Sequence, residues 1–197
     1  SNGSYNYVAW TFQKAPGYFD IQTYSGTGNV QAISHNLNSA PGFIICKSTN
    51  KALAWYCYHV SLGNTKFIEL NQPNIANTGN PWNNTDPTDS VFTVGSDGSV
   101  NAYDGEYVAY LFADTPGLIK CGSGSGSTVS DCGFEPQWVM YKATSETGNW
   151  MMFDTPRTET RYLSGNIPDE ERNSNITFLD NGFQLPNGSS FEYIYVA

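Results

Sequence analysis

Apolar residues along the chain alternate with polar ones or form short runs of four to seven, bounded by Gly, Asn, Ser, Asp and Pro. The runs are rich in β-branched and aromatic residues, and turn-forming residues recur every 8 to 12 positions. This pattern predicts antiparallel β-strands that pack as a sandwich or a barrel-like architecture. Little helix is expected, and mainly at residues 166–173, where Pro168 precedes acidic side chains. The clearest runs are YVAWTF, FDIQTYSG, GFIICK, AWYCYHV, TKFIEL, SVFTVG and EYVAYLFA.

The chain is also similar to itself. Residues 41–73 align without a gap on residues 136–168, with seven identical columns that include Trp55 with Trp150 and Asn71 with Asn166. Unrelated segments of this length and ordinary composition would share about two. The segment EYVAYLFA around Tyr107 recurs as EYIYVA near the end of the chain, and NYVAWTF near its beginning is a third copy. An internal duplication follows from these matches.

The duplication predicts an all-β fold of two tandem antiparallel β-sandwich units, jelly-roll-like in form. The first unit is expected over residues 14–114 and the second over residues 115–197. Residues 1–13 are interpreted as the closing strand of a preceding unit, so we expect the chain to be part of a longer protein.

The charge balance limits the partners. Nine Lys and Arg stand against eighteen Asp and Glu, which gives a net charge of −9, and the basic residues are scattered between Lys14 and Arg172. Binding to nucleic acid or to an anionic membrane surface needs a concentrated positive patch, so neither partner is expected. No apolar run approaches the roughly 18 residues that a membrane-spanning helix requires, so no membrane insertion is expected.

Four cysteines form two pairs with equal spacing, Cys46 with Cys57 and Cys121 with Cys132. Neighbouring antiparallel strands would allow each pair to form a cross-strand disulfide. The favoured alternative is that all four are small buried apolar residues. The spacing and the two histidines match no zinc site, so no metal or other cofactor is expected.

The loop at residues 77–89, NTGNPWNNTDPTD, is the most site-like stretch. A Trp ring offers a flat apolar face for a sugar, and Asn and Asp side chains bond hydroxyl groups. Trp82, Asn83, Asn84 and Asp86 are therefore candidate carbohydrate-binding residues. The simpler alternative, slightly favoured, is that Trp82 folds back as a plug over one end of its own sandwich.

Catalytic signatures are weak. Neither His35 nor His59 lies in a recognisable nucleophile–base context, and no G-x-S-x-G motif occurs. Asp86 and Asp89 are the best pair for Ca²⁺, but Asp is also an ordinary turn residue. We therefore assign no catalytic residues. Glycoside hydrolysis needs two carboxyl groups at a defined distance in the folded protein, and spacing along the sequence does not give that distance.

Several segments in a fixed order resemble a known family. They are YVAWTF, TYSGTGNVQAISHNLNSAPGFIICK, WYCYHVSLGNTKFIELN, WNNTDPTDSVFTVGSDGSVN and YVAYLFA, followed by GFEPQWVMYKATSETGNW, FLDNGF and YIYVA. This set resembles the repeat-containing domain of virion proteins of marine tailed phages, which typically lies near the C-terminal end of tail-fibre-like or other surface-exposed structural proteins.

The resemblance implies a non-enzymatic virion structural protein on the exterior of the particle, in a tail fibre or other appendage. Its expected partners are other virion proteins and a host-surface polysaccharide or receptor, with a homo-oligomer as a further possibility. Host attachment and receptor binding are then the expected roles. The alternatives are a capsid-decorating structural protein and a glycan-degrading depolymerase domain.

Overall fold

The computed structural model describes residues 8–157 and 161–197, and the described chain is almost entirely β. Strands make up 42% of the structure and helices 4%, which confirms the predicted all-β, sandwich-like class. The strands of the first half are β1 (Phe19–Ser25), β2 (Gln31–Ser34), β3 (Pro41–Ser48), β4 (Tyr56–His59), β5 (Lys66–Glu69), β6 (Asn77–Thr78), β7 (Val91–Val94) and β8 (Glu106–Ala113). Those of the second half are β9 (Cys121–Ser125), β10 (Val129–Asp131), β11 (Trp138–Ala143), β12 (Met151–Asp154), β13 (Arg161–Ser164), β14 (Arg172–Asn173), β15 (Thr177–Leu179), β16 (Gly182–Gln184) and β17 (Glu192–Val196).

Helix is confined to two short turns, α1 (Gly98–Asn101) and the 3₁₀ turn η1 (Thr155–Arg157). Asp97 caps α1 by accepting a hydrogen bond from the Ser99 amide at 2.8 Å. The helix predicted at residues 166–173 is absent, so that expectation was wrong. The segment connects β13 to β14, and the carboxylate of Glu171 pairs with two arginines instead of stabilising a helix terminus.

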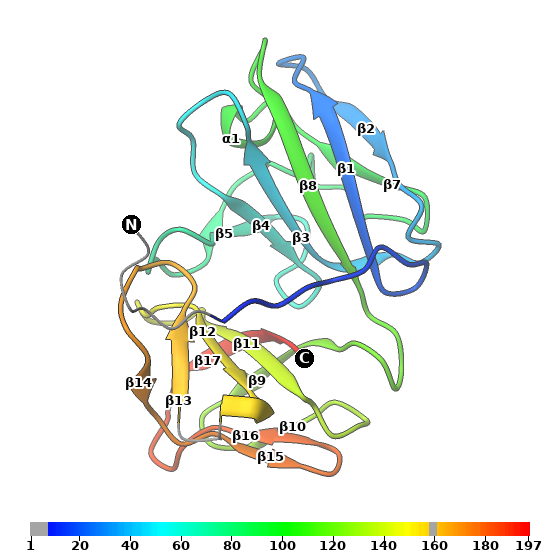
Figure 1. Ribbon diagram of the computed structural model, residues 1–197. Helices are drawn as coiled ribbons and strands as arrows, with labels where there is room; N and C mark the ends of the chain where they lie inside the picture. The colour runs from blue at the N-terminus through cyan, green and yellow to red at the C-terminus, as the bar shows by residue number, and fades with distance from the viewer. Residues whose placement is uncertain (1–7, 158–160) are drawn as a thin grey trace, which may run out of the picture.

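The strands form two six-stranded antiparallel sheets, each with a smaller sheet beside it (Figure 1). The first large sheet has the order β1-β8-β3-β4-β5-β6 and the second the order β9-β17-β11-β12-β13-β14. The small partners are β2-β7 in the first half and β10-β16-β15 in the second. Strands aligned by the internal repeat therefore take the same places in both halves.

The two halves share equivalent hydrogen bonds as well as the same strand order. Asn71 accepts a hydrogen bond from the Trp55 amide, and Asn166 accepts one from the Trp150 amide, both at 3.0 Å. Both bonds hold the end of a strand hairpin. These contacts give the identical Trp and Asn columns the same structural role in both halves, and the division into units at residues 14–114 and 115–197 stays a prediction.

The large sheets face each other across an interface that we call the seam. One core cluster joins Phe43 of β3 to Met140, Trp150 and Ile194 of the second half, so apolar packing continues from one half into the other. A separate cluster lies between the second large sheet and its small partner. Because β3 meets a core on both faces, nearly all of its side chains are buried. This explains why GFIIC is continuously apolar rather than alternating.

Polar groups also cross the seam. The indole N–H of Trp150 donates to the carbonyl of Glu69 at 2.9 Å, and the amide of Gly148 donates to the carbonyl of Pro73 at the same distance. Nδ1 of His59 accepts from the Ser61 amide, so Nε2 carries the proton and donates to the Tyr195 carbonyl at 3.0 Å. His59 is 1% exposed, so both ring nitrogens are satisfied inside the interface.

Residues 8–14, which we call the strap, run along the seam between the two halves (Figure 1, dark blue). They form no strand, which corrects the expectation of a closing strand at residues 1–13 over its described part; residues 1–7 lie outside the described residues. A closing strand in either unit is paired on both sides, and the strap has no such neighbours. Its rings pack instead: Trp10 lies edge-on to Trp138, with centroids 6.4 Å apart.

No helix in the described part of the chain has the length and apolar character needed to cross a bilayer.

Candidate binding site at the seam

Trp82, the centre of the loop predicted to bind carbohydrate, is 2% exposed. Its indole N–H donates to the carbonyl of Lys66 at 2.9 Å, and its ring lies edge-on to Tyr58. Neither ring face is free for a sugar, so the assignment of Trp82 to a binding surface is wrong. The alternative interpretation, a plug over one end of its own sandwich, agrees with the structure.

The neighbours of Trp82 are turn residues. Asn83 and Asn84 have φ angles of 53° and 49°, a left-handed conformation that Asn tolerates better than most residues. Asp86 is exposed and accepts a hydrogen bond from Asn64 at 2.8 Å. Without an exposed ring beside them, these three residues do not form the predicted platform.

The four cysteines are buried and free. Cys57 pairs in register with Ile45 and Cys46 with Tyr56, so the two thiols point to opposite faces of their sheet. Cys121 and Cys132 belong to different core clusters. The disulfide alternative is therefore not met by this geometry. Burial raises the pKa of Cys46 to about 12 and that of Cys132 to about 11, as expected for thiols that serve as apolar core residues.

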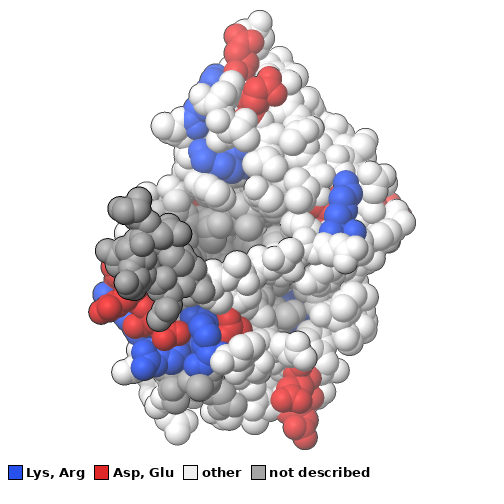
Figure 2. All heavy atoms as spheres, viewed as in Figure 1, with Lys and Arg blue, Asp and Glu red and all other residues white. Residues whose placement is uncertain are grey.

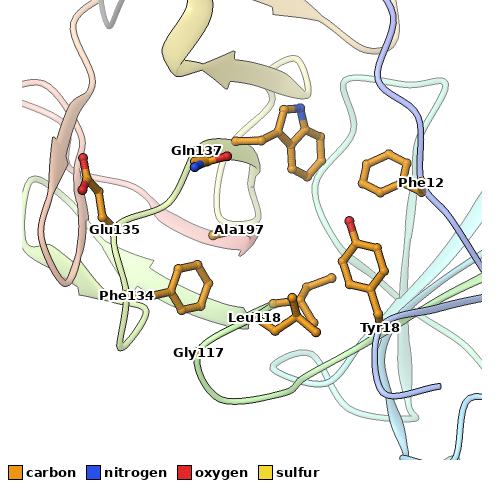
Figure 3. A pocket seen from close by; sticks show the side chains of 10 residues that line it. Phe12, Tyr18, Gly117, Leu118, Phe134, Glu135, Gln137 and Ala197 are labelled. Carbon is orange, nitrogen blue, oxygen red and sulfur yellow. The ribbon is translucent and has the colours of Figure 1, made fainter. Parts of the chain in front are cut away.

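A pocket of about 430 Å³ lies where the strap, the first half and the second half meet (Figure 3). We call it the seam pocket. Phe12 and Tyr18 form one side, with Leu118 and Phe134 facing them from the segment between β8 and β9 and from the loop before β11. Its lining residues are Phe12, Tyr18, Gly117, Leu118, Ile119, Phe134, Glu135, Gln137, Trp138 and Ala197. The pocket exists only because two units and the strap come together.

The pocket combines ring faces with a small polar rim. Tyr18, Phe134 and Trp138 are half-buried, whereas Glu135 and Gln137 are exposed. Partial burial raises the pKa of Tyr18, so its phenol stays protonated and can donate a hydrogen bond at neutral pH. The indole N–H of Trp138 is buried and has no acceptor among the described residues, a cost that proteins seldom leave in an ordinary core.

The sequence profile described as Domain of unknown function (DUF7483) matches residues 3–197, nearly the whole chain. The chain belongs to the DUF7483 family. No match was found among curated proteins or among solved structures.

Three carboxylates of this DUF7483 domain, those of Asp20, Asp114 and Asp131, are held by contacts within the fold. Asp20 is buried; desolvation alone would raise its pKa, but bonds from Lys14, Asn36, Gln22 and its neighbouring amide lower it to about 2. Asp114 pairs with Lys120 at 3.2 Å beside a second hollow, of about 320 Å³, that Asp131 also lines. Asp131 in turn accepts hydrogen bonds from Gly133 and Asn181.

Within residues 8–157 and 161–197, no group of three or more His, Cys, Asp and Glu side chains has a geometry that would hold a metal ion. On the face shown in Figure 2, Lys and Arg lie in small separate groups with Asp or Glu nearby, and most of the surface is uncharged.

Sequence reasoning missed the seam pocket of the DUF7483 domain because its residues lie far apart in the chain. Phe134 and Gln137 lie on either side of Glu135 and Pro136, where the second aligned repeat segment begins, and Tyr18 follows the Pro16-Gly17 turn. The available signal was that Tyr18 and Phe134 lie beside Pro residues just before a strand, where aromatic side chains have no strand neighbours. Only the packing of the two units brings them together.

Proposed function

We propose that this DUF7483 domain is a non-enzymatic structural part of a virion appendage, exposed outside the particle, that contacts a host-surface glycan through the seam pocket. The observation that carries the proposal is the combination of ring faces from Tyr18, Phe134 and Trp138 with the amide of Gln137 and the carboxylate of Glu135 around one cavity. Apolar rings cover the C–H face of a pyranose, and a few polar groups bond its hydroxyls.

The charge of the pocket narrows the ligand to an uncharged pyranose. Among the described residues that line the cavity there is no Lys or Arg and one acidic residue, Glu135, and the whole chain carries a net charge of −9. An anionic sugar would be repelled both locally and by the overall field. Neutral hexose or N-acetylhexosamine residues of a surface polysaccharide meet no such penalty.

A non-enzymatic role is the simpler proposal for this pocket. Glycoside hydrolysis requires two carboxyl groups on opposite sides of the scissile bond. One carboxylate, that of Glu135, lines the seam pocket. Packing of two sandwiches through a continuous core also suits a part that must stay rigid in an assembled particle.

Binding is tested by calorimetry and by NMR titration with methyl pyranosides of glucose, galactose, mannose and N-acetylglucosamine and with their trisaccharides. We expect Tyr18→Ala and Gln137→Ala each to weaken the best ligand by about tenfold, equivalent to roughly 1.4 kcal/mol. The matched control is Tyr103→Ala, because Tyr103 is a 72% exposed ring outside the pocket. Equal binding by all variants, or binding by none including the parent protein, contradicts the proposal.

The virion assignment needs a separate experiment. A reconstruction of the phage particle that encodes this chain should place the fold in a tail fibre or other external appendage. Density for the same fold on the capsid surface would favour the capsid-decorating alternative instead.

A further inference from the structure

Phe12 lines two neighbouring cavities at the seam. The first is the seam pocket, and the second is an apolar pocket of about 420 Å³ beside β1, β3 and β8. The second pocket is lined by Trp10, Thr11, Phe12, Phe19, Ile21, Ile45, Trp55, Tyr110 and Phe112. The Phe12 ring therefore forms the wall between the two cavities.

Contacts on both sides hold this wall in place. The ring centroid of Phe12 lies 5.3 Å from that of Phe112 and 5.6 Å from that of Phe19, which line the second pocket. It lies 5.8 Å from Trp138 and 6.4 Å from Tyr18, which line the seam pocket. A side chain in contact with four rings has little room to turn aside.

Trp10 fixes the strap two residues before Phe12. Its indole N–H donates to Oδ2 of Asp154 at 2.8 Å, and the guanidinium of Arg157 lies over its ring at 5.3 Å. Arg157 in turn bonds Oδ1 of Asp154 at 2.8 Å. The carboxylate is 5% exposed and satisfied from both sides, so it anchors the strap to the second half.

The two halves differ where the strap lies. Trp150 is 1% exposed and packs against Phe43 across the seam, with ring centroids 6.0 Å apart. In the repeat, Trp55 aligns with Trp150, and Trp138 aligns with Phe43. Trp55, however, is half-buried and lines the pocket that Trp10 and Phe12 also line. The strap thus stands where the second copy of this contact would otherwise form.

We propose that Phe12 is the residue that determines which length of saccharide the seam accepts, with Trp10 and Asp154 as its positioning residues. This inference rests on the proposed function of the seam pocket. In the parent protein the Phe12 ring confines a ligand to one pyranose in the seam pocket. Loss of the ring joins the two cavities into one aromatic groove that continues toward Trp55 and Tyr110.

The test compares the affinity for a trisaccharide with that for its methyl pyranoside, using the panel above. For Phe12→Ala we expect the ratio of the two affinities to rise by about tenfold, because additional sugar rings gain aromatic contacts. Trp10→Phe keeps an aromatic ring but removes the N–H donor, so it should raise the ratio less and weaken the monosaccharide severalfold. Gln13→Ala, an exposed position in the same strap, is the matched control and should leave the ratio unchanged.

An unchanged ratio in a folded Phe12→Ala protein overturns the inference, as does an equal rise in Gln13→Ala. If Phe12→Ala does not fold, Phe12→Leu should shift the ratio in the same direction by less, and no shift there also overturns it.

If the parent protein binds none of these sugars, the proposed function is wrong, but the role of the Phe12 ring in separating the two pockets can still be tested. A crystal structure of Phe12→Ala should then contain one continuous groove. Two separate pockets, or closure of Trp55 onto Trp138, would contradict the role of Phe12.

Discussion

His59 joins the two units through Nε2, which bonds the Tyr195 carbonyl, while Nδ1 is held by the Ser61 amide of its own unit, and this buried imidazole makes the seam sensitive to acid. Desolvation lowers its pKa to about 4 from 6.5, although the Tyr195 carbonyl and the charge of Asp114 act in the opposite direction. The unfolded chain therefore binds this proton at a higher pH than the folded chain does. The stabilisation is complete above pH 6.5 and is lost as the pH falls toward 4.

The shift corresponds to about 3 kcal/mol of unfolding free energy between pH 7 and pH 4. We expect His59→Gln to remove this part of the pH dependence, because its amide stays neutral over the whole range. Urea unfolding at several pH values measures the effect. Parallel pH profiles for the parent and the variant would contradict it.

Substitution of Trp82 tests whether this side chain is a structural plug rather than part of a saccharide-binding site. Trp82→Ala removes a buried ring and leaves the Lys66 carbonyl without its donor. We expect a loss of about 3–5 kcal/mol in the free energy of unfolding and no change in saccharide affinity for the protein that remains folded. Tyr103→Ala, on the surface, should change stability by less than about 0.5 kcal/mol. Weakened saccharide binding specific to Trp82→Ala would restore the loop as a binding site.

At the scale of elements, the GSGSGS segment at residues 122–127 has a structure that its composition does not predict. Its composition is typical of a flexible hairpin tip, but residues 122–125 lie in the edge strand β9 and pair with β17. The rings of Tyr193 and Tyr195 lie directly over Gly124 and Gly122, so a Cβ atom at Gly124 would be 2.4 Å from Cζ of Tyr193. Glycine is needed there for space rather than for flexibility.

Gly124→Ala should therefore destabilise the protein by about 1–3 kcal/mol through overpacking. Ser123→Ala is the control, because Ser123 is exposed on the other face of the same strand. Thermal unfolding of both variants distinguishes them. Equal melting temperatures would show that Tyr193 moves away without cost.

The strands could be predicted from the sequence because their signal is local. Alternation and turn residues mark β1, β7 and β8, and the repeat locates β11 and β12 from β3 and β4. Whether an aromatic side chain is buried is not decided by the local sequence. Trp82 in a polar loop and Tyr18 beside a turn look equally accessible to a ligand when only the sequence is considered. Burial by a distant segment decides between them, and the seam pocket draws its lining from four separate parts of the chain.

At the scale of the whole molecule, the continuous core predicts a single cooperative unfolding transition. Trp150→Phe deletes the hydrogen bond to the Glu69 carbonyl across the seam and should cost about 1 kcal/mol, or roughly 2–4 °C in Tm. Calorimetry of the parent and the variant should give one peak in each case. Two resolved peaks would mean that the halves unfold independently.

The pairing of the two sheets also has a consequence for assembly. Phe43 contacts Trp150 across the seam, but the pair that the repeat aligns with them, Trp138 and Trp55, lines two different cavities beside the strap, so only one half of an isologous contact is formed. An isologous contact is closed, since each surface is occupied by its counterpart. In this domain the strap takes the place of one of the two equivalent contacts, so the two units are not interchangeable across the seam.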